Sequence, residues 1–294
     1  MLNRKRNVET FLGCEGEYSD SRIILYGAPF DSTTSYRPGT RFASKVMRSE
    51  SYGLETYSPY QDLDLEDCAV FDGGDLELCF GDTKHALNDI YEYAKSVITD
   101  NKLPFLIGGE HLVTLPAVKA VFEKYPDLHI IHFDAHTDLR DDYLGNNLSH
   151  ATVIRRIWDL VGDNKIAQFG IRSGERSEWY WSKQHTDIHK FNLAGLSEVI
   201  KRFKGKPVYF TIDLDVLDPA VFPGTGTPEA GGVSFNELLQ AIIEVTAGCN
   251  VVGCDMVELS PPLDASGAST AVALKLLREM LLSLEKPFIK PAEV

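Results

Sequence analysis

Eight short apolar segments, each four or five residues long, recur along the chain between longer stretches of mixed polarity. They are rich in Ile, Val and Phe and mostly do not alternate with polar residues, which is typical of strands buried on both faces of a parallel sheet. The stretches between them carry apolar residues at helical spacing, for example Leu87, Ile90 and Ala94. The pattern predicts an α/β fold with a mainly parallel, roughly eight-stranded sheet, either an open three-layer α/β/α sandwich or a closed barrel. The predicted strands are residues 23–27, 69–72, 104–107, 129–133, 165–169, 187–190, 208–212 and 251–255.

The chain has 294 residues and contains no Pro/Gly/Ser-rich linker, internal repeat or low-complexity tract. We therefore expect a single domain over residues 1–294, although length alone would also allow two domains. Asp and Glu number 43 against 29 Lys and Arg, which gives a formal net charge of −14. Binding to a nucleic-acid backbone requires clustered Lys and Arg. We therefore expect no nucleic-acid partner.

Signals for export or membrane insertion are weak. No run approaches the roughly 18 apolar residues of a membrane span, so we expect no membrane partner. The basic residues 4–6 are followed by polar residues, which argues against a secretory signal. The five cysteines form no CxxC pair and cannot all pair with one another. These features favour a cytoplasmic protein with reduced thiols.

Three of the predicted strands are followed by clusters of Asp and His. The motif GGEH (108–111) follows one strand, DAHTD (134–138) the next, and DLD (213–215) a third. Residues two apart on an extended chain point to the same side, so the side chains of Asp134, His136 and Asp138 are expected to converge, and so are those of Asp213 and Asp215. Carboxylates this close together would resist ionisation unless cations lay between them. The candidate metal ligands are His111, Asp134, His136, Asp138, Asp213 and Asp215.

Four Asp and two His suit a divalent ion that prefers oxygen ligands and an octahedral geometry, and Mn²⁺ fits best. Zinc takes fewer ligands and often thiolates, and no Cys belongs to the cluster. Six ligands are too many for one catalytic ion that must also bind water, so two ions sharing carboxylates are expected. Each motif alone would also fit a strand-end turn or a helix cap. His129 and His132 lie within a predicted strand and are expected to be core or supporting residues.

Together with further segments along the chain, these motifs resemble the signatures of the ureohydrolase (arginase/agmatinase) family. The order and spacing of the segments make the resemblance specific, although each segment alone is only moderately so. The segments are GAPFD (27–31), SYRPG (35–39), GGEH (108–111), DAHTD (134–138), TIDLDVLDP (211–219), PGTGTPE (223–229) and MVELSP (256–261).

The resemblance implies an arginase-like, open α/β/α sandwich with two Mn²⁺ per chain, and a trimer or hexamer of identical subunits. One ion would be held by His111, Asp134, Asp138 and Asp213, and the other by Asp134, His136, Asp213 and Asp215. Asp134 and Asp213 would bridge the two ions. Glu258 matches the residue of the family that binds the guanidinium group, and His150 matches its proton-shuttling His. Glu110 departs from the Asp that is common before the ligand His, but it is not a ligand position.

The implied chemistry is attack on a guanidinium carbon by a hydroxide that bridges the two metals. Bound metal lowers the pKa of water to about 7, which makes hydroxide available. Glu258 would orient the planar guanidinium group through charge-assisted hydrogen bonds. Asp138 would pass a proton to the departing amine, and His150 would relay protons to solvent. A single-zinc deacetylase of related fold would not need the full ligand set, and a silent binding protein would be expected to lack a ligand.

The loop at residues 139–147 is expected to line the far end of the substrate pocket. Arginases have an Asn where this chain has Arg140, and the segment instead resembles agmatinases. We therefore expect agmatine, a small cationic guanidine, to be cleaved to putrescine and urea, with Asp141, Asp142 or Tyr143 receiving its ammonium group. If Arg140 points inward, 4-guanidinobutyrate or formiminoglutamate becomes the alternative. Arginine is the least favoured substrate.

Overall fold

The computed structural model describes residues 9–289 and contains, within that range, an eight-stranded sheet in which every neighbouring pair is parallel. The strand order is β4-β1-β5-β10-β9-β6-β7-β8. All eight predicted segments are strands: β1 (Ile23–Gly27), β4 (Val70–Asp75), β5 (Leu103–Ile107), β6 (His129–Phe133), β7 (Ile166–Ile171), β8 (Asp187–Lys190), β9 (Pro207–Asp213) and β10 (Asn250–Val257). Because β4 and β8 are the two ends of this order, the sheet is open and the barrel alternative is excluded.

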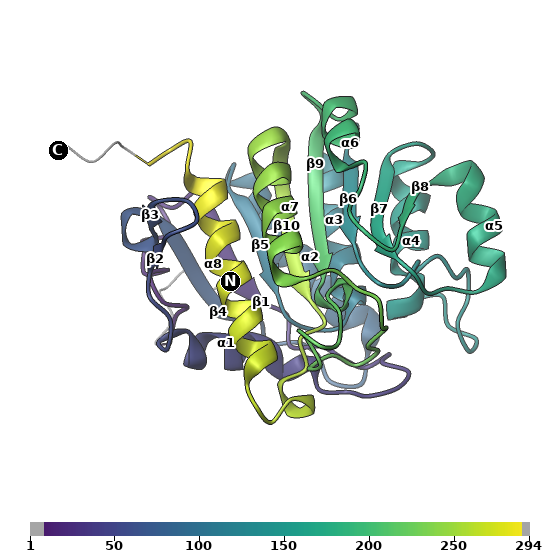
Figure 1. The fold of residues 1–294 in the computed structure, drawn as a ribbon, viewed down its shortest axis with the longest axis horizontal. Coiled ribbons are helices and arrows are strands. Elements are labelled where there is room, and N and C mark those ends of the chain that lie inside the picture. Colours follow the sequence, from purple (N-terminus) through teal and green to yellow (C-terminus); the bar gives the residue numbers. More distant parts are fainter. Residues whose placement is uncertain (1–8, 290–294) are drawn as a thin grey trace.

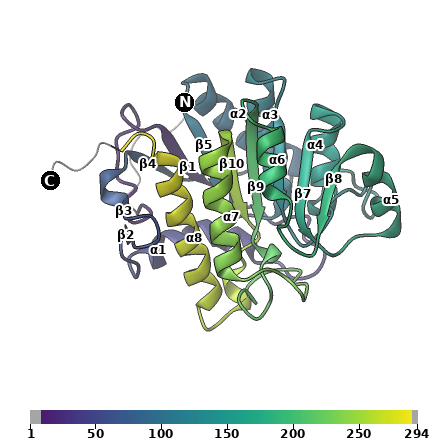
Figure 2. The same cartoon turned by 45° about the horizontal axis from the view of Figure 1, so that its top comes forward.

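Helices cover both faces of the sheet, which confirms the predicted three-layer sandwich (Figure 1). One layer packs in the order α1, α8, α7, α6, and the other in the order α2, α3, α4. Figure 2 shows α6, α7 and α8 in front of the strands, with α5 (Arg176–His185) beyond the edge strand β8. The first layer consists of α1 (Ala43–Ser51), α6 (Leu196–Arg202), α7 (Phe235–Gly248) and α8 (Ala268–Glu285), and the second of α2 (Thr83–Thr99), α3 (Thr114–Lys124) and α4 (Val153–Val161).

Shorter elements connect these layers. β2 (Tyr57–Ser58) and β3 (Leu63–Asp64) form a separate antiparallel pair that the sequence analysis did not predict. Each comprises only two residues, too few for a periodic pattern. The 3₁₀ helices are η1 (Thr40–Phe42), η2 (Leu65–Asp67), η3 (His111–Val113), η4 (His150–Thr152), η5 (Leu214–Val216) and η6 (Pro261–Leu263).

The core consists of two apolar clusters, one on each face of the sheet, and successive residues of a strand pack into them alternately. In β1, Ile23 and Leu25 join the apolar cluster under α7 and α8, whereas Ile24 and Tyr26 join the cluster under α2 and α3. All four side chains are buried. A strand that is apolar on both faces is therefore what a three-layer fold requires, and it explains why the segments do not alternate in polarity.

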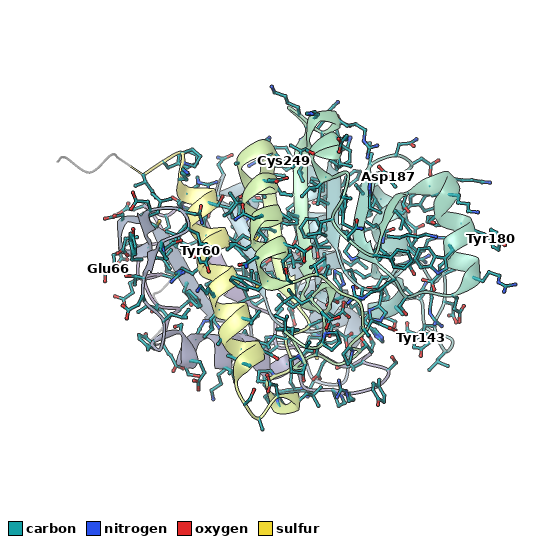
Figure 3. The ribbon with its side chains drawn as sticks, in the orientation of Figure 1. Tyr60, Glu66, Tyr143, Tyr180, Asp187 and Cys249 are labelled. Atoms are coloured by element: carbon teal, nitrogen blue, oxygen red, sulfur yellow. The ribbon has the colours of Figure 1, made fainter. Side chains whose placement is uncertain are left out.

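The parallel arrangement brings the carboxyl ends of all eight strands to one edge of the sheet, where ligands bind in open α/β folds. The four central neighbours β5, β10, β9 and β6 end there, and each is followed by predicted site residues. Figure 3 labels Tyr143 in the loops at this edge and Cys249 at the opposite end, where β10 begins. None of the helices in residues 9–289 has the length and apolar character needed to cross a membrane. The basic residues 4–6 lie outside the described residues.

Candidate active site

The two glycines that precede His111 make the turn from β5 into η3. Gly108 and Gly109 have φ angles of 75° and 85°, in the left-handed region that favours glycine. A Cβ atom on Gly109 would lie 2.4 Å from the carbonyl oxygen of Ala28, which leaves no room for a side chain. The turn places His111 over the carboxyl edge of the sheet.

His111 lies against three of the predicted carboxylate ligands. Its Nδ1 atom is 3.1 Å from Oδ2 of Asp134 and 3.3 Å from Oδ2 of both Asp138 and Asp213. Despite these short distances, Nδ1 is buried and has no hydrogen-bond partner within residues 9–289. The four groups therefore converge on a common point without satisfying one another, as the ligands of a shared cation do.

The opposite edge of the His111 ring fixes its tautomer. Nε2 lies 2.9 Å from the hydroxyl oxygen of Thr211, and that hydroxyl donates to Oδ1 of Asp255 at 2.6 Å. Since the Thr211 proton is committed to Asp255, the oxygen accepts from Nε2–H of His111. In the neutral ring Nδ1 is then the deprotonated nitrogen, whose lone pair would be available to a metal.

A second group forms around His136. Its Nδ1 atom lies 2.9 Å from Oδ2 of Asp215 and 3.5 Å from Oδ1 of Asp134. The potential ligand atoms of His136, Asp134 and Asp215 all lie within 4.8 Å of one another. Oδ2 of Asp215 is also buried without a hydrogen-bond partner within the described range. Asp134 is thus shared between the His111 and His136 groups.

Backbone amides hold one oxygen of each of three carboxylates. Oδ1 of Asp134 accepts from the amide of His136 at 2.5 Å, and Oδ1 of Asp213 accepts from the amide of Asp215 at 2.8 Å. Oδ1 of Asp215 accepts from the amide of Ala135 at 3.0 Å. The first two contacts lie within the D-x-H and D-x-D motifs, whereas the third joins the two motifs.

His132 lies beside the cluster as a supporting residue. Its Nε2 atom is 2.8 Å from Oδ2 of Asp134, while its Nδ1 atom is 3.1 Å from the side-chain amide nitrogen of Gln168. Because Gln168 donates to Nδ1, His132 carries its proton on Nε2 and donates to Asp134. The potential ligand atoms of His132, Asp134 and His111 also lie within 4.8 Å of one another. The supporting Gln168 carries no sequence signal that would have singled it out.

Protonation equilibria in the bare cluster are strongly displaced. Burial and the charge of Asp134 raise the pKa of Asp138 to about 7, and burial together with Asp215 raises the pKa of Asp213. Burial disfavours the charged form of His111, but the carboxylates of Asp134, Asp138 and Asp213 close to its ring outweigh this and raise its pKa. The metal-free cluster therefore retains protons, which divalent cations can replace. The residues fit a metal centre.

Two of the predicted catalytic residues have left-handed backbone conformations. Asp138 has φ of 52° and Glu258, after β10, has φ of 68°. Such conformations are costly for residues other than glycine and persist where the surrounding structure imposes them, often at functional sites. The carboxylate of Glu258 is anchored because Oε1 accepts from the amide of His111 at 2.7 Å. Glu258 is thereby fixed directly beside the metal-ligand cluster.

His150 begins η4, where its amide donates to the hydroxyl of Thr33 at 3.1 Å. Its Nε2 atom lies 3.1 Å from Oγ of Ser35, and the ring of Tyr143 packs edge-on at 6.1 Å between centroids. Burial lowers the pKa of His150 to about 4, so the ring is neutral at neutral pH. The hydroxyl of Thr33 in turn donates to the buried Glu110, which ties the His150 loop to the residue beside His111.

These groups surround a cavity of about 280 Å³ at the carboxyl edge of the sheet. Arg140 lines its wall but is paired with acids: Nη1 lies 2.9 Å from Oε1 of Glu175, and Nε lies 3.8 Å from Oε2 of Glu178. The guanidinium group also stacks 4.5 Å above the ring of Tyr143. The lining includes His136, Asp138, Arg140, Tyr143, His150, Glu175, Glu178, Asp213 and Glu258.

In the described part of the chain, the residues that line this cavity do not include Asp141 or Asp142, contrary to the expectation from the sequence. The side chain of Asp141 is 74% exposed and pairs with Arg156 of α4 at 2.6 Å. Asp142 instead accepts from the amide of Gly145 and stabilises a turn. Acids from the loop and helix after β7, Glu175 and Glu178, take their place. Their position after a strand of the same sheet was the signal that could have identified them.

The comparison with known proteins agrees with this geometry. Residues 21–283 match the arginase family. This chain belongs to the arginase family. An agmatinase of Bacillus subtilis (strain 168) is 49% identical over 281 residues, covering 95% of this chain and 97% of that protein.

Two further members of the arginase family share fewer identical residues with this chain. A human mitochondrial guanidino acid hydrolase is 37% identical over 273 residues, covering 88% of this chain and 77% of that protein. The crystal structure of an agmatine ureohydrolase of Thermoplasma volcanium superposes with a TM-score of 0.88 at 32% identity, covering 96% of each chain. The resemblance to the ureohydrolase family inferred from the motifs is thus confirmed, and so is the arginase-like fold.

Proposed function

We propose that this arginase-family hydrolase cleaves the guanidinium group of agmatine to putrescine and urea at a pair of Mn²⁺ ions. The observation that carries the proposal is the buried cluster in which Nδ1 of His111 and Oδ2 of Asp215 both lack hydrogen-bond partners in the described structure. Each orphaned atom belongs to one of two groups of potential ligands that share Asp134. Two adjacent cation sites account for both.

We assign His111, Asp134, Asp138 and Asp213 to one ion and Asp134, His136, Asp213 and Asp215 to the other. The oxygen-rich donor set, with two imidazoles and no thiolate, suits Mn²⁺. When bound, the two ions would lower the pKa of water so that hydroxide is available near neutral pH. The chain supplies the ligands already oriented, because backbone amides hold the carboxylates and Thr211 holds His111.

The remaining steps fall to side chains of the cavity. Glu258, with Oε1 anchored by the amide of His111, would accept hydrogen bonds from the guanidinium group and orient its carbon over the cluster. Asp138 would carry a proton to the departing amine. A neutral His150 has one donor and one acceptor nitrogen, and this is what a relay toward solvent through Ser35 needs.

The charge of the cavity wall favours a substrate with a second positive end. Arg140 is 28% exposed, and its charge is offset by Glu175 and Glu178. An ammonium group can approach these acids without breaking an ion pair, whereas a carboxylate has to compete with them for Arg140. We therefore favour agmatine, with Glu175 in place of Asp141 or Asp142 near its ammonium end.

A guanidine that ends in a carboxylate, such as 4-guanidinobutyrate, is the second candidate. One observation favours it: Arg140 does line the cavity. Release of urea from agmatine, 4-guanidinobutyrate and arginine, each with Mn²⁺ present, separates these candidates. We expect kcat/KM to be highest for agmatine. Turnover of 4-guanidinobutyrate without turnover of agmatine would refute the assignment.

We also propose that residues 1–294 form one ureohydrolase domain that acts in the cytoplasm as a homotrimer or homohexamer. The family match over residues 21–283 supports the single domain. Sedimentation of the purified protein would give the number of subunits, and a monomer would contradict the proposed assembly.

A further inference from the structure

The carboxylate of Glu178 contacts the residues on both sides of Asp138. Glu178 lies in the first turn of α5 and is only 4% exposed. Its Oε1 atom accepts from the hydroxyl of Thr137 at 2.6 Å and from the amide of Leu139 at 2.9 Å. One oxygen from a helix beyond the edge of the sheet thus holds both neighbours of a proposed metal ligand.

The other oxygen ties Glu178 to its own helix. Oε2 accepts from the amide of Glu175 at 2.7 Å, in the manner of a capping box at the start of α5. It is also 3.8 Å from Nε of Arg140, but Arg140 makes its closer ion pair with Glu175, at 2.9 Å. Glu175 is therefore the main ion-pair partner of Arg140. The hydrogen bonds of Glu178 go instead to the hydroxyl of Thr137 and to backbone amides.

Asp138 needs such support because its backbone is in a left-handed conformation, with φ of 52°. This conformation is costly for a residue other than glycine, so contacts with neighbouring residues help to hold it. The carbonyl of Asp138 accepts from the amide of Arg155 at 3.1 Å, which fixes one side of the turn. The contacts of Glu178 with Thr137 and Leu139 fix the residues before and after it.

We propose that Glu178 is a positioning residue that holds the Asp138 carboxylate in the geometry required for metal binding. The inference rests on the proposed function, because it takes Asp138 as a ligand. Glu178 itself is not a proposed ligand. It would act through its hydrogen bonds to Thr137 and Leu139, the two neighbours of Asp138. Removal of partners that orient metal ligands lowers metal affinity by about 10–100-fold.

The test uses the full chain stripped of metal, with Mn²⁺ binding followed by electron paramagnetic resonance of the free ion. The variants are E178A, T137V, the double variant E178A/T137V, and T137S, which keeps the hydroxyl. We expect E178A to weaken one of two Mn²⁺ equivalents by about 10–100-fold and T137V to weaken the same equivalent less. Adding T137V to E178A should lower Mn²⁺ affinity by less than T137V does in the wild type. The reason is that both substitutions remove the same hydrogen bond, between Thr137 and Glu178. T137S should bind as the wild type does.

E279Q is the matched control. Glu279 lies in α8, is fully buried and is hydrogen-bonded to Ser58, Gln61 and Arg278, none of which belongs to the metal-ligand cluster. It should lower the thermal midpoint of the metal-free protein while leaving Mn²⁺ affinity unchanged. Unchanged Mn²⁺ affinity in E178A and T137V, or strictly additive effects in the double variant, would overturn the role of Glu178. Failure of the wild type to bind Mn²⁺ would instead refute the proposed function.

Discussion

Replacing Glu258 by Gln tests how the proposed active site recognises a guanidinium group. Glutamine keeps the shape of the side chain, and its carbonyl oxygen can still accept from the amide of His111, as Oε1 does now at 2.7 Å. The NH₂ group would replace Oε2 and meet the N–H groups of the substrate as a second donor. Glu258 is only 6% exposed, so water cannot compensate for the lost charge.

Loss of one partner of a buried, hydrogen-bonded charge pair costs about 2–5 kcal/mol. At about 1.4 kcal/mol for each factor of ten, kcat/KM for agmatine should fall by about 30-fold to 5,000-fold. The assay is urea release over a range of agmatine concentrations, with the Mn²⁺ content of both proteins measured in parallel. A decrease of less than tenfold at equal Mn²⁺ content would refute the role of Glu258. If kcat/KM falls only in proportion to lost Mn²⁺, Glu258 supports metal binding and does not bind the substrate.

Two further predictions concern the cavity wall. Because burial lowers the pKa of His150 to about 4 from an ordinary value near 6.5, only the unfolded chain binds its proton between these values. The unfolding free energy therefore falls as the pH drops through this window, by up to about 3 kcal/mol at pH 4, and urea melts of metal-free H150N should show a weaker decline. An equal decline in both proteins would contradict the neutral buried ring. R140Q should change KM for agmatine by no more than about fivefold, because partly exposed ion pairs contribute little, and should raise KM for 4-guanidinobutyrate. A large loss of agmatine binding would place Arg140 among the residues that the substrate requires.

The sequence predicted the parts of the structure that depend on local pattern. Segments apolar on both faces, such as β1, are typical of strands in a parallel sheet, and the D-x-D and D-x-H motifs could be placed at strand ends without knowing the order of strands. Whether the sheet was open could not be read from these segments, since barrels use the same pattern. The insertion of β10 between β5 and β9 brings Glu258 beside His111, and no local signal encodes that order.

Residues that support the site were missed because their role arises from tertiary contacts alone. Glu178, Gln168 and Thr211 are ordinary polar residues in their own segments, and only the order of β5, β10, β9, β6 and β7 in the sheet brings them to the ligands. Asp141 and Asp142 were placed in the pocket by proximity to the motif. In the structure Asp141 pairs with Arg156 at the surface, and Asp142 accepts a hydrogen bond from the amide of Gly145 in a turn.

The number of Mn²⁺ ions bound by each wild-type chain tests the central claim most directly. The metal-stripped protein would be titrated with Mn²⁺ in an isothermal calorimeter, with an H111A variant as the matched control. The converging carboxylates and the two orphaned ligand atoms predict two ions per chain in the wild type and weaker or lost binding of one ion in H111A. One ion or none in the wild type would contradict a binuclear centre and the mechanism built on it.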